Sequence, residues 1–407
     1  MEWNKIDQIL RDTAYVRMGG TEAELECAKY LQNECAQLGL EAYIEPFAVQ
    51  MATIREAVLT VDGKEIPCKG YFNSGSGEVE APLLYLPSTD PCSLTQVAGK
   101  IVLVDRLGYW VYQDLFDKGA VAFITYDGNA NFPDRDIDQK ELRDFVSKGK
   151  KIPGVNINAK DAIEIVRSGA KTARIVLQQD EYTGESRNVI AELPGEVDEW
   201  IVLTAHYDST SLSTGAWDNM SGSIGLLGIA EKFAKEPHRY GLRFIWCGSE
   251  ERGLLGAKAY CAAHEEELKK VVLNVNLDMI GCIMGKFIAV CTTEEKLVHY
   301  IQYLACEKGF PVDARDGVYS SDSTPFADKG VPALSFARIA PGNTASIHNR
   351  YDTVDVMKAE QTALDIDFIN AFVERMANAR FCPVAREIPE KMKEKLDVYL
   401  LRKKEGK

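Results

Sequence analysis

The first fifty residues of this 407-residue chain combine a helix pattern with a strand pattern. From Thr21, apolar positions recur every three or four residues over TEAELECAKYLQNECAQLGL, which is typical of an amphipathic helix. Thr21 followed by Glu24 has the form of a capping box, and Gly39 is suited to end the helix. The next segment, LEAYIEPFAV, is predicted to be extended.

The pattern changes over residues 51–182. Short apolar runs rich in β-formers are separated there by Gly, Pro and Asp, with helices predicted near Gln113–Lys118 and Lys160–Ser168. The block contains no histidine and no cluster of metal-ligating residues, so we expect a separate α+β module inserted into the main chain. The predicted strands are AVLTVDG, PLLYLPS, KIVLVDR, VAFITYDG and TARIVLQ.

Residues 183–380 alternate between strand and helix patterns. Such alternation predicts an α/β fold, a mostly parallel (mixed) central sheet sandwiched by helices on both faces. The predicted strands are WIVLTAH, LRFIWCGSE, VVLNVNLDM and VPALSFA, and the predicted helices are SGSIGLLGIAEKFAKE, GLLGAKAYCAAHEEELKK and EEKLVHYIQYLACEKG.

These patterns divide the chain into three parts. Residues 1–50 and 183–380 are expected to form the main domain, and residues 51–182 the inserted one. Residues 381–407 are expected to form a charged C-terminal helix or tail, whose basic end is either solvated or packed on a partner subunit.

Composition narrows the class of protein. With 46% hydrophobic and 27% charged residues the chain is globular, and its longest apolar runs are of strand length, too short to span a membrane. The net charge of −14 disfavours binding to nucleic acid or to anionic membranes. The N-terminus lacks the pattern of a signal peptide, and the ten scattered cysteines form no CxxC pair, so we expect a cytoplasmic protein with reduced, mostly buried thiols.

Two of the five histidines are candidates for chemistry. His206 ends an apolar strand, the position where open α/β sheets bind ligands, and Asp208 is a candidate to accept a hydrogen bond from a ligating histidine. His348 lies in a loop, SIHNRYDT, after the last predicted strand. The other three lie on or beside helices, where an ordinary surface or core role is favoured: His238, His264 and His299.

Four acidic residues lie at or after the ends of predicted strands, as His206 does. Asp218 precedes a helix, where it could also be a simple capping residue. Glu250 and Glu251 end the next strand, and because neighbouring side chains on an extended segment point in opposite directions, one could bind a metal while the other faces substrate. Asp278 ends a buried strand, where a carboxylate needs a charge partner or hydrogen bonds.

Together these residues predict a metal site. Two histidines with three Asp or Glu ligands suit zinc, cobalt or manganese. Five ligands exceed the three or so that one open catalytic zinc takes, and they fit two ions roughly 3.5–4 Å apart that share one carboxylate.

Several motifs in order resemble the co-catalytic zinc aminopeptidases, a family with bacterial leucyl aminopeptidases and the vacuolar aminopeptidase of yeast among its members. The resemblance covers residues 186–360 and, through VRMGGTEAELECAKYL and LGLEAYIEPF, the first fifty. The motifs are HYDS, GAWDNMSG, CGSEERGLLGAKAY, NLDMIG, SSDSTPFADKGVPAL and SIHNRYDT.

The resemblance implies a role for each matching position. His206 and Asp278 would bind one zinc ion, Glu251 and His348 the other, and Asp218 would bridge the two. Glu250 would be the general base acting on a water that bridges the two ions, and the Asp218–Asn219 peptide bond would be cis.

Two further features follow from the resemblance. Some relatives place an oxyanion-stabilising tyrosine just before the S-D motif, and Tyr319, one residue closer to Ser321-Asp322, is its candidate counterpart. In the insert, KIVLVDRLGYWVYQDLFDKGAVAFITYDG resembles the protease-associated domain that several relatives carry at this place.

The expected function is therefore that of a metal-dependent exopeptidase that acts on peptides, most simply an aminopeptidase; a homo-oligomer is left open. A carboxypeptidase or another amidohydrolase could use the same ligands, with Arg338 and Arg350 as a clamp for a terminal carboxylate. A non-catalytic binding protein on the same scaffold, like the transferrin receptor, is disfavoured because all five ligands and the base are present.

Overall fold

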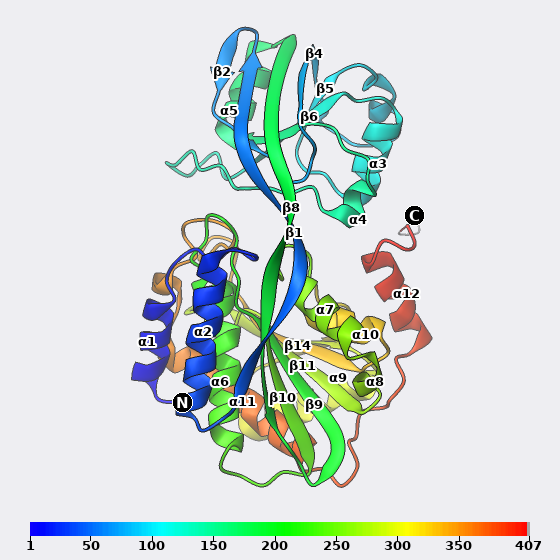
Figure 1. The fold of residues 1–407 in the computed structure, drawn as a ribbon. Coiled ribbons are helices and arrows are strands. Elements are labelled where there is room, and N and C mark those ends of the chain that lie inside the picture. The colour runs from blue at the N-terminus through cyan, green and yellow to red at the C-terminus, as the bar shows by residue number, and fades with distance from the viewer. Residues whose placement is uncertain (405–407) are drawn as a thin grey trace. The chain divides into compact units, whose positions relative to one another are not determined.

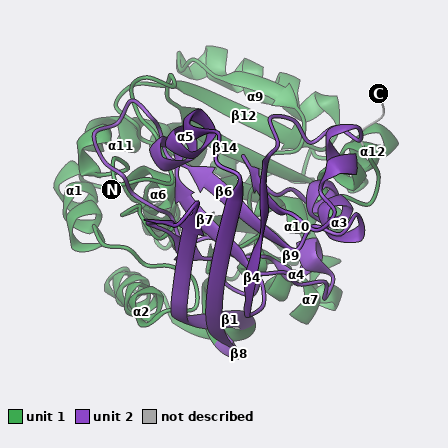
Figure 2. Ribbon diagram, turned by 90° about the horizontal axis from the view of Figure 1, so that it is seen from above, with its two compact units in different colours: residues 1–48, 185–407 green, residues 49–184 purple. Residues whose placement is uncertain are grey.

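A computed structural model describes residues 1–404 and divides the chain into two compact units. Unit 1 contains residues 1–48 and the chain from residue 185 onward, and unit 2 contains residues 49–184 (Figure 2). These boundaries lie two residues outside those predicted for the insert at each end.

Unit 1 is built on a mixed sheet whose strands run in the order β13-β12-β14-β11-β9-β10-β8. The central strands β14, β11, β9 and β10 are parallel neighbours, whereas β8 on one side and β12 on the other run antiparallel to theirs. This confirms the predicted mixed α/β sheet, but β12 and β13 were not predicted. The strands are β8 (Thr172–Leu193), β9 (Val197–His206), β10 (Tyr240–Cys247), β11 (Val271–Leu277), β12 (Lys286–Thr292), β13 (Asp313–Asp316) and β14 (Ala333–Ile339).

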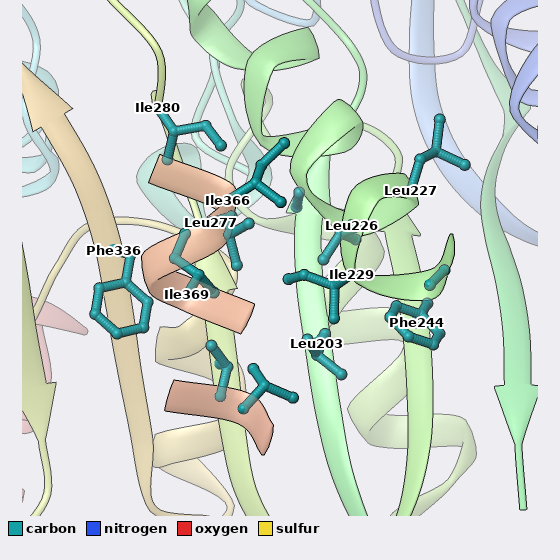
Figure 3. Close-up of a cluster of buried hydrophobic side chains, with 14 of the residues drawn as sticks. Leu203, Leu226, Leu227, Ile229, Phe244, Leu277, Ile280, Phe336, Ile366 and Ile369 are labelled. Carbon is teal, nitrogen blue, oxygen red and sulfur yellow. The ribbon is translucent and has the colours of Figure 1, made fainter. Parts of the chain in front are cut away.

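Helices cover both faces of this sheet (Figure 1). One face packs against α1 (Trp3–Asp12), α2 (Glu22–Gln37), α6 (Ser221–Phe233), α9 (Glu295–Lys308) and α11 (Ala359–Ala377). Figure 3 shows part of that core, where Leu226 and Ile229 of α6 lie near Leu203 of β9, and Ile366 and Ile369 of α11 lie near Leu277. The other face packs against α7 (Leu255–Ala263), α8 (Glu265–Leu268) and α10 (Ser323–Asp328).

These helices differ from the sequence prediction in two ways. Helices α1, α10 and α11 were not predicted, and the single helix expected over residues 253–270 is divided at His264. His264 lies between two carboxylates, with Nε2 2.8 Å from Glu45 Oε2 and Nδ1 3.2 Å from Glu267 Oε1. The division therefore places this histidine in a local ion-pair network and not in a binding site.

Helix α6 approaches the sheet unusually closely at its first turn. A Cβ atom on Gly222 would lie 2.3 Å from the carbonyl oxygen of Leu277, and one on Gly225 would lie 2.5 Å from the Leu277 side chain. Only glycine permits this approach. It brings the Asp218 segment, which immediately precedes α6, next to the end of β11.

Unit 2 is an α+β module with its own core. Its strands run in the order β8-β4-β5-β6-β7-β3, with β1 paired to β2. Buried aliphatic residues of β5, β6 and β7 pack with α5. The elements are β1 (Ala42–Val61), β2 (Lys64–Ile66), β3 (Lys69–Gly70), β4 (Gly77–Tyr85), β5 (Ile101–Val104), β6 (Ala122–Asp127), β7 (Gly154–Asn158), α3 (Tyr109–Asp117), α4 (Asp144–Ser147) and α5 (Ala159–Ser168).

The C-terminal segment is part of unit 1 and not a solvated tail. Helix α12 (Glu390–Tyr399) buries Ile388, Met392 and Leu396 against α10 and β14. Beyond the helix, Arg402 makes two hydrogen bonds to Asp328, of 2.6 and 2.7 Å. The side chain of Arg402 is 54% exposed, so this part of the basic end is both solvated and paired within the chain.

Two expectations drawn from the composition concern membrane-spanning segments and the cysteines, and both can be compared with residues 1–404. Among residues 1–404, no helix is both long enough and apolar enough to cross a membrane. All ten cysteines lie in this range and are free, and six of them are buried, although Cys92 and Cys306 are exposed.

Candidate metal centre

The predicted site residues meet at one edge of the unit 1 sheet. His206 is the last residue of β9, Asp278 follows β11 directly, and Glu250 and Glu251 follow β10 after a two-residue turn. Because β9, β10 and β11 are parallel, their carboxyl ends lie at the same edge. His348 comes from the long segment after β14.

Asp218 lies at the centre of the cluster and faces both histidines. Its Oδ1 is 3.1 Å from His206 Nε2, and its Oδ2 is 3.1 Å from His348 Nε2. Asp278 Oδ1 lies 3.5 Å from the same His206 nitrogen, and Glu251 Oε2 lies 3.2 Å from the His348 nitrogen. Within the described residues, the side chains able to hold a metal ion thus form two groups that share Asp218: His206, Asp218 and Asp278; and Asp218, Glu251 and His348.

The charge of this cluster fits bound cations. Burial opposes protonation of His206, but the carboxylates around it, first Glu250, raise its pKa well above the ordinary value. In the same way Asp218 and Glu251 raise the pKa of His348 to about 11 against the effect of burial. Asp278 Oδ1 is buried and accepts no hydrogen bond. Buried carboxylates require hydrogen bonds or positive charge, and neutral imidazole with carboxylate is a ligand set suited to zinc.

Glu250 belongs to neither group of ligands. Its Oε2 is 3.9 Å from His206 Nε2, and only 11% of its side chain is exposed. Burial, followed by the nearby charges of Glu251 and Asp322, raises its pKa well above the ordinary value for a carboxyl group, with His206 acting in the opposite direction. Glu250 is therefore a carboxyl group with a high proton affinity placed beside the ligands.

Asp208 fixes the backbone of the glutamate pair. Its carboxylate is fully buried and accepts hydrogen bonds from the Glu250 amide at 2.9 Å and from the Glu251 amide at 3.2 Å. Its Oδ1 is also 3.5 Å from His206 Nδ1. Asp208 therefore lies beside His206, as the sequence suggested, and in addition its hydrogen bonds hold the Glu250-Glu251 turn.

Hydrogen bonds of the neighbouring Asn219 side chain fix the backbone around Asp218. The Asp218–Asn219 peptide bond is cis, as the resemblance implied. The Asn219 side chain donates to the carbonyl of Leu277 at 2.9 Å and accepts from the amide of Met279 at 2.9 Å. It therefore links the Asp218 segment to the residues on either side of Asp278.

Sequence reasoning missed Asp352, which is fully buried and links the two histidine segments. Its carboxylate accepts from the Trp217 amide at 2.8 Å, the Asp218 amide at 3.2 Å and the Ser213 hydroxyl at 3.0 Å. It lies four residues after His348, in the same SIHNRYDT segment. That proximity was the available signal, but a Tyr-Asp-Thr sequence alone is also typical of an ordinary turn.

Asp352→Asn is expected to weaken zinc binding about 10–100-fold, the usual cost of losing a group that orients metal ligands. An amide at this position turns an NH2 group toward donors that require an acceptor, so the Asp218 segment loses a fixed position. Zinc affinity would be measured by competition with a chromogenic chelator. Asp355→Asn, at an exposed aspartate three residues away, is the matched control and should bind zinc like the wild type.

The other residues singled out in the sequence differ in their position relative to the metal-ligand cluster. Tyr319 is partly buried, and its side chain packs on Ala337 of β14, next to the Phe336 carbonyl that accepts from the Asp278 amide at 3.0 Å. Burial and then the charges of Asp278, Asp218 and Glu250 raise its pKa. Arg338 is committed elsewhere, with a two-pronged ion pair to Asp365 and a hydrogen bond to the carbonyl of Gly285. The three histidines expected to have ordinary roles belong to neither group of ligands: His238, His264 and His299.

Comparisons with known proteins agree with this geometry. Residues 188–371 match the model of Peptidase family M28. Aminopeptidase YwaD of Bacillus subtilis (strain 168) is 27% identical over 379 residues, which span 88% of this chain and 80% of that protein. Leucine aminopeptidase 2 of Trichophyton rubrum is 27% identical over 280 residues, or 65% of this chain, but this chain spans only 54% of it.

A solved structure shows the same fold. The structure of BSAP, a zinc aminopeptidase from Bacillus subtilis, superposes with a TM-score of 0.77 at 24% identity and covers 95% of this chain and 98% of that one. The predicted resemblance to zinc aminopeptidases is confirmed by these matches together.

Proposed function

We propose that this chain, whose residues 188–371 match the model of Peptidase family M28, is a zinc-dependent aminopeptidase of that family. It would release residues one at a time from the free amino terminus of a peptide. The observation that carries the proposal is the position of Asp218, whose two oxygens face two separate histidines, each with a further carboxylate beside it. One shared aspartate between two such groups is the arrangement expected for a pair of ions.

The proposed roles of the ligands follow these groups. His206 and Asp278 hold one ion, Glu251 and His348 hold the other, and Asp218 bridges them. When bound, two zinc ions (or cobalt or manganese) would polarise the scissile carbonyl group and lower the pKa of a water molecule that they share.

Glu250 is the proposed general base. It is buried beside His206 and belongs to neither ligand group, and burial raises its pKa, which strengthens a carboxylate as a proton acceptor. The carboxylate would take the proton of the attacking water and pass it to the departing amine. Asp208 keeps Glu250 in place through the Glu250 amide, and the Tyr319 hydroxyl would donate a hydrogen bond to the oxyanion.

Two observations favour an amino terminus over a carboxyl terminus as the group that is recognised. The site has an excess of carboxylates, which attracts an ammonium group and repels a terminal carboxylate. A carboxypeptidase needs a cationic clamp, and Arg338 is already bound to Asp365 on both oxygens. A non-catalytic binding protein would have no use for Glu250 beside an intact set of ligands.

A panel of matched peptides tests the direction of cleavage. With zinc, a peptide with a free amino terminus should release its first residue, and the same peptide with an acetylated amino terminus should be resistant. The products would be identified by mass spectrometry, with the Glu250→Gln chain as the inactive control. Equal cleavage of the acetylated peptide, with release from the carboxyl end, would show that the carboxypeptidase alternative is correct.

We also propose that unit 2 is a protease-associated-like domain that modifies substrate range and takes no part in metal binding. The support is that both groups of candidate ligands lie in unit 1 and that unit 2 has its own core. Replacement of residues 51–182 by a short linker should leave zinc binding largely intact and change which peptides are cleaved. Loss of zinc from a folded variant of this kind would contradict the division.

A further inference from the structure

The C-terminal helix α12 contacts a segment that leads directly into the candidate site. This segment, residues 316–320, follows β13 and ends one residue before Ser321-Asp322. Tyr319 is the residue in it whose side chain packs on Ala337 of β14, next to Phe336, whose carbonyl accepts a hydrogen bond from the amide of the metal-ligand residue Asp278 at 3.0 Å. Figure 1 shows α12 at the C-terminal end of the chain, and its buried side chains pack against α10, which begins at Ser323.

Alternate residues of the segment contact α12. Asp316 accepts a hydrogen bond from Lys395 at 2.8 Å, and Val318 packs against the apolar cluster of Met392 and Leu396. The hydroxyl of Ser320 lies 2.6 Å from the hydroxyl of Tyr399. These contacts come from successive turns of one helix, so α12 holds the segment along its whole length.

Tyr319 points away from the helix. Its ring packs against a different cluster, formed by Ile288 and Val290 of β12 and Ala337 of β14. Burial and the charges of Asp278, Asp218 and Glu250 set the environment of its hydroxyl. The residues on either side of Tyr319, Val318 and Ser320, contact α12, whereas the Tyr319 side chain packs on β12 and β14.

Hydrogen bonds also fix the backbone of the segment at Gly317 and at the carbonyl group of Tyr319. The Gly317 amide donates to the carbonyl of Cys291 at 3.0 Å, and the Thr292 hydroxyl donates to the Gly317 carbonyl at 2.8 Å. The Tyr319 carbonyl accepts from the Ser321 amide and the Thr324 hydroxyl. Between these anchors, the side chains of Val318 and Ser320 are held by α12, and this part of the segment determines the position of the Tyr319 ring.

We propose that α12 is a positioning element of the active site, which holds the Tyr319 hydroxyl at the metal-ligand cluster through Tyr399 and the apolar face of the helix. Tyr399 touches neither substrate nor metal ligand in this scheme and acts only through Tyr319. The proposal rests on the proposed function for its effect on catalysis, but the ordering of the segment by α12 can be measured without any activity.

The test compares Tyr399→Phe, which removes only one hydroxyl group, with Tyr303→Phe, at a tyrosine that is 79% exposed on α9. Hydrogen exchange of the peptide that covers residues 314–322 is measured first, in the metal-free chain. Tyr399→Phe should speed exchange in this peptide and in no peptide of the other sheet strands, whereas Tyr303→Phe should match the wild type. Unchanged exchange in Tyr399→Phe would overturn the proposal.

Steady-state kinetics of the zinc-loaded variants then show whether the ordering of residues 316–320 by α12 affects kcat. Tyr399→Phe should lower kcat about two- to tenfold, the range expected for one lost hydrogen bond, with KM and zinc content unchanged. In a Tyr319→Phe background, the same change should lower kcat no further. Faster exchange with an unaltered kcat, or an equal loss in both backgrounds, would reject positioning through Tyr319.

The two proposals fail in distinguishable ways. If the zinc-loaded wild type released no residue from any free amino terminus, the proposed function would fail, and hydrogen exchange alone would decide whether α12 orders the segment. If the wild type were active and Tyr399→Phe changed neither exchange nor kcat, the proposed function would stand and the role of α12 would be rejected.

Discussion

Glu250→Gln is expected to keep both zinc ions and to lower kcat on the order of 10²–10⁴-fold, with little change in KM. Glutamine has nearly the same shape and leaves the backbone hydrogen bond from residue 250 to Asp208 in place, but its amide cannot accept the proton of the attacking water. Because Glu250 belongs to neither ligand group, the metal ions lose no ligand. Steady-state kinetics beside metal analysis of the same sample would measure both effects.

Glu251→Gln is the matched control, since it makes the same chemical change one residue away. Glu251 lies 3.2 Å from His348 Nε2 and belongs to the second ligand group, so this variant should bind one ion more weakly and recover part of its activity in excess zinc. The opposite result, with a metal lost from Glu250→Gln and both retained in Glu251→Gln, would reverse the two roles.

Removal of metal is expected to reduce peptide release by roughly 10³-fold or more, because a metal ion that polarises the reacting groups contributes several kcal/mol of transition-state stabilisation. Activity should return when zinc or cobalt is added to the stripped chain. The measurement is the initial rate on a peptide with a free amino terminus before chelation, after it, and during readdition of metal.

Circular dichroism of the stripped chain provides the control for this experiment. Aliphatic and aromatic side chains fill the space between the sheet and the helices on both of its faces. The fold should therefore persist without metal. Full activity in a chain shown by metal analysis to be free of divalent ions would contradict the metal-dependent mechanism.

His206 and Asp278 could be predicted as ligands because each lies at a strand end that the hydrophobic pattern alone identifies. WIVLTAH and VVLNVNL are buried runs, and the polar residues His206 and Asp278 come where these runs stop. The pattern could not assign the two glutamates, since strand alternation allows either one to face the metal. The structure separates them by distance, with Glu251 close to His348 and Glu250 nearer His206.

Other features could not be predicted because they depend on contacts between residues far apart in sequence. Asp352 accepts from amides more than 130 residues away, and no local pattern distinguishes such a carboxylate from a turn residue. The same holds for β12, whose antiparallel pairing with β14 joins distant parts of the chain. It also holds for Lys395 of α12, which pairs with Asp316, and for Arg402 beyond the helix, which pairs with Asp328.

The central claim is that one aspartate holds two metal ions at the edge of the sheet, and the number of zinc ions bound per chain tests it most directly. Zinc content would be determined for the wild type and for Asp218→Ala after equilibration at the same free zinc concentration. The account predicts two ions in the wild type and fewer than one in Asp218→Ala, because both ligand groups include Asp218. A wild type that binds a single ion, or an Asp218→Ala chain that still binds two, would contradict it.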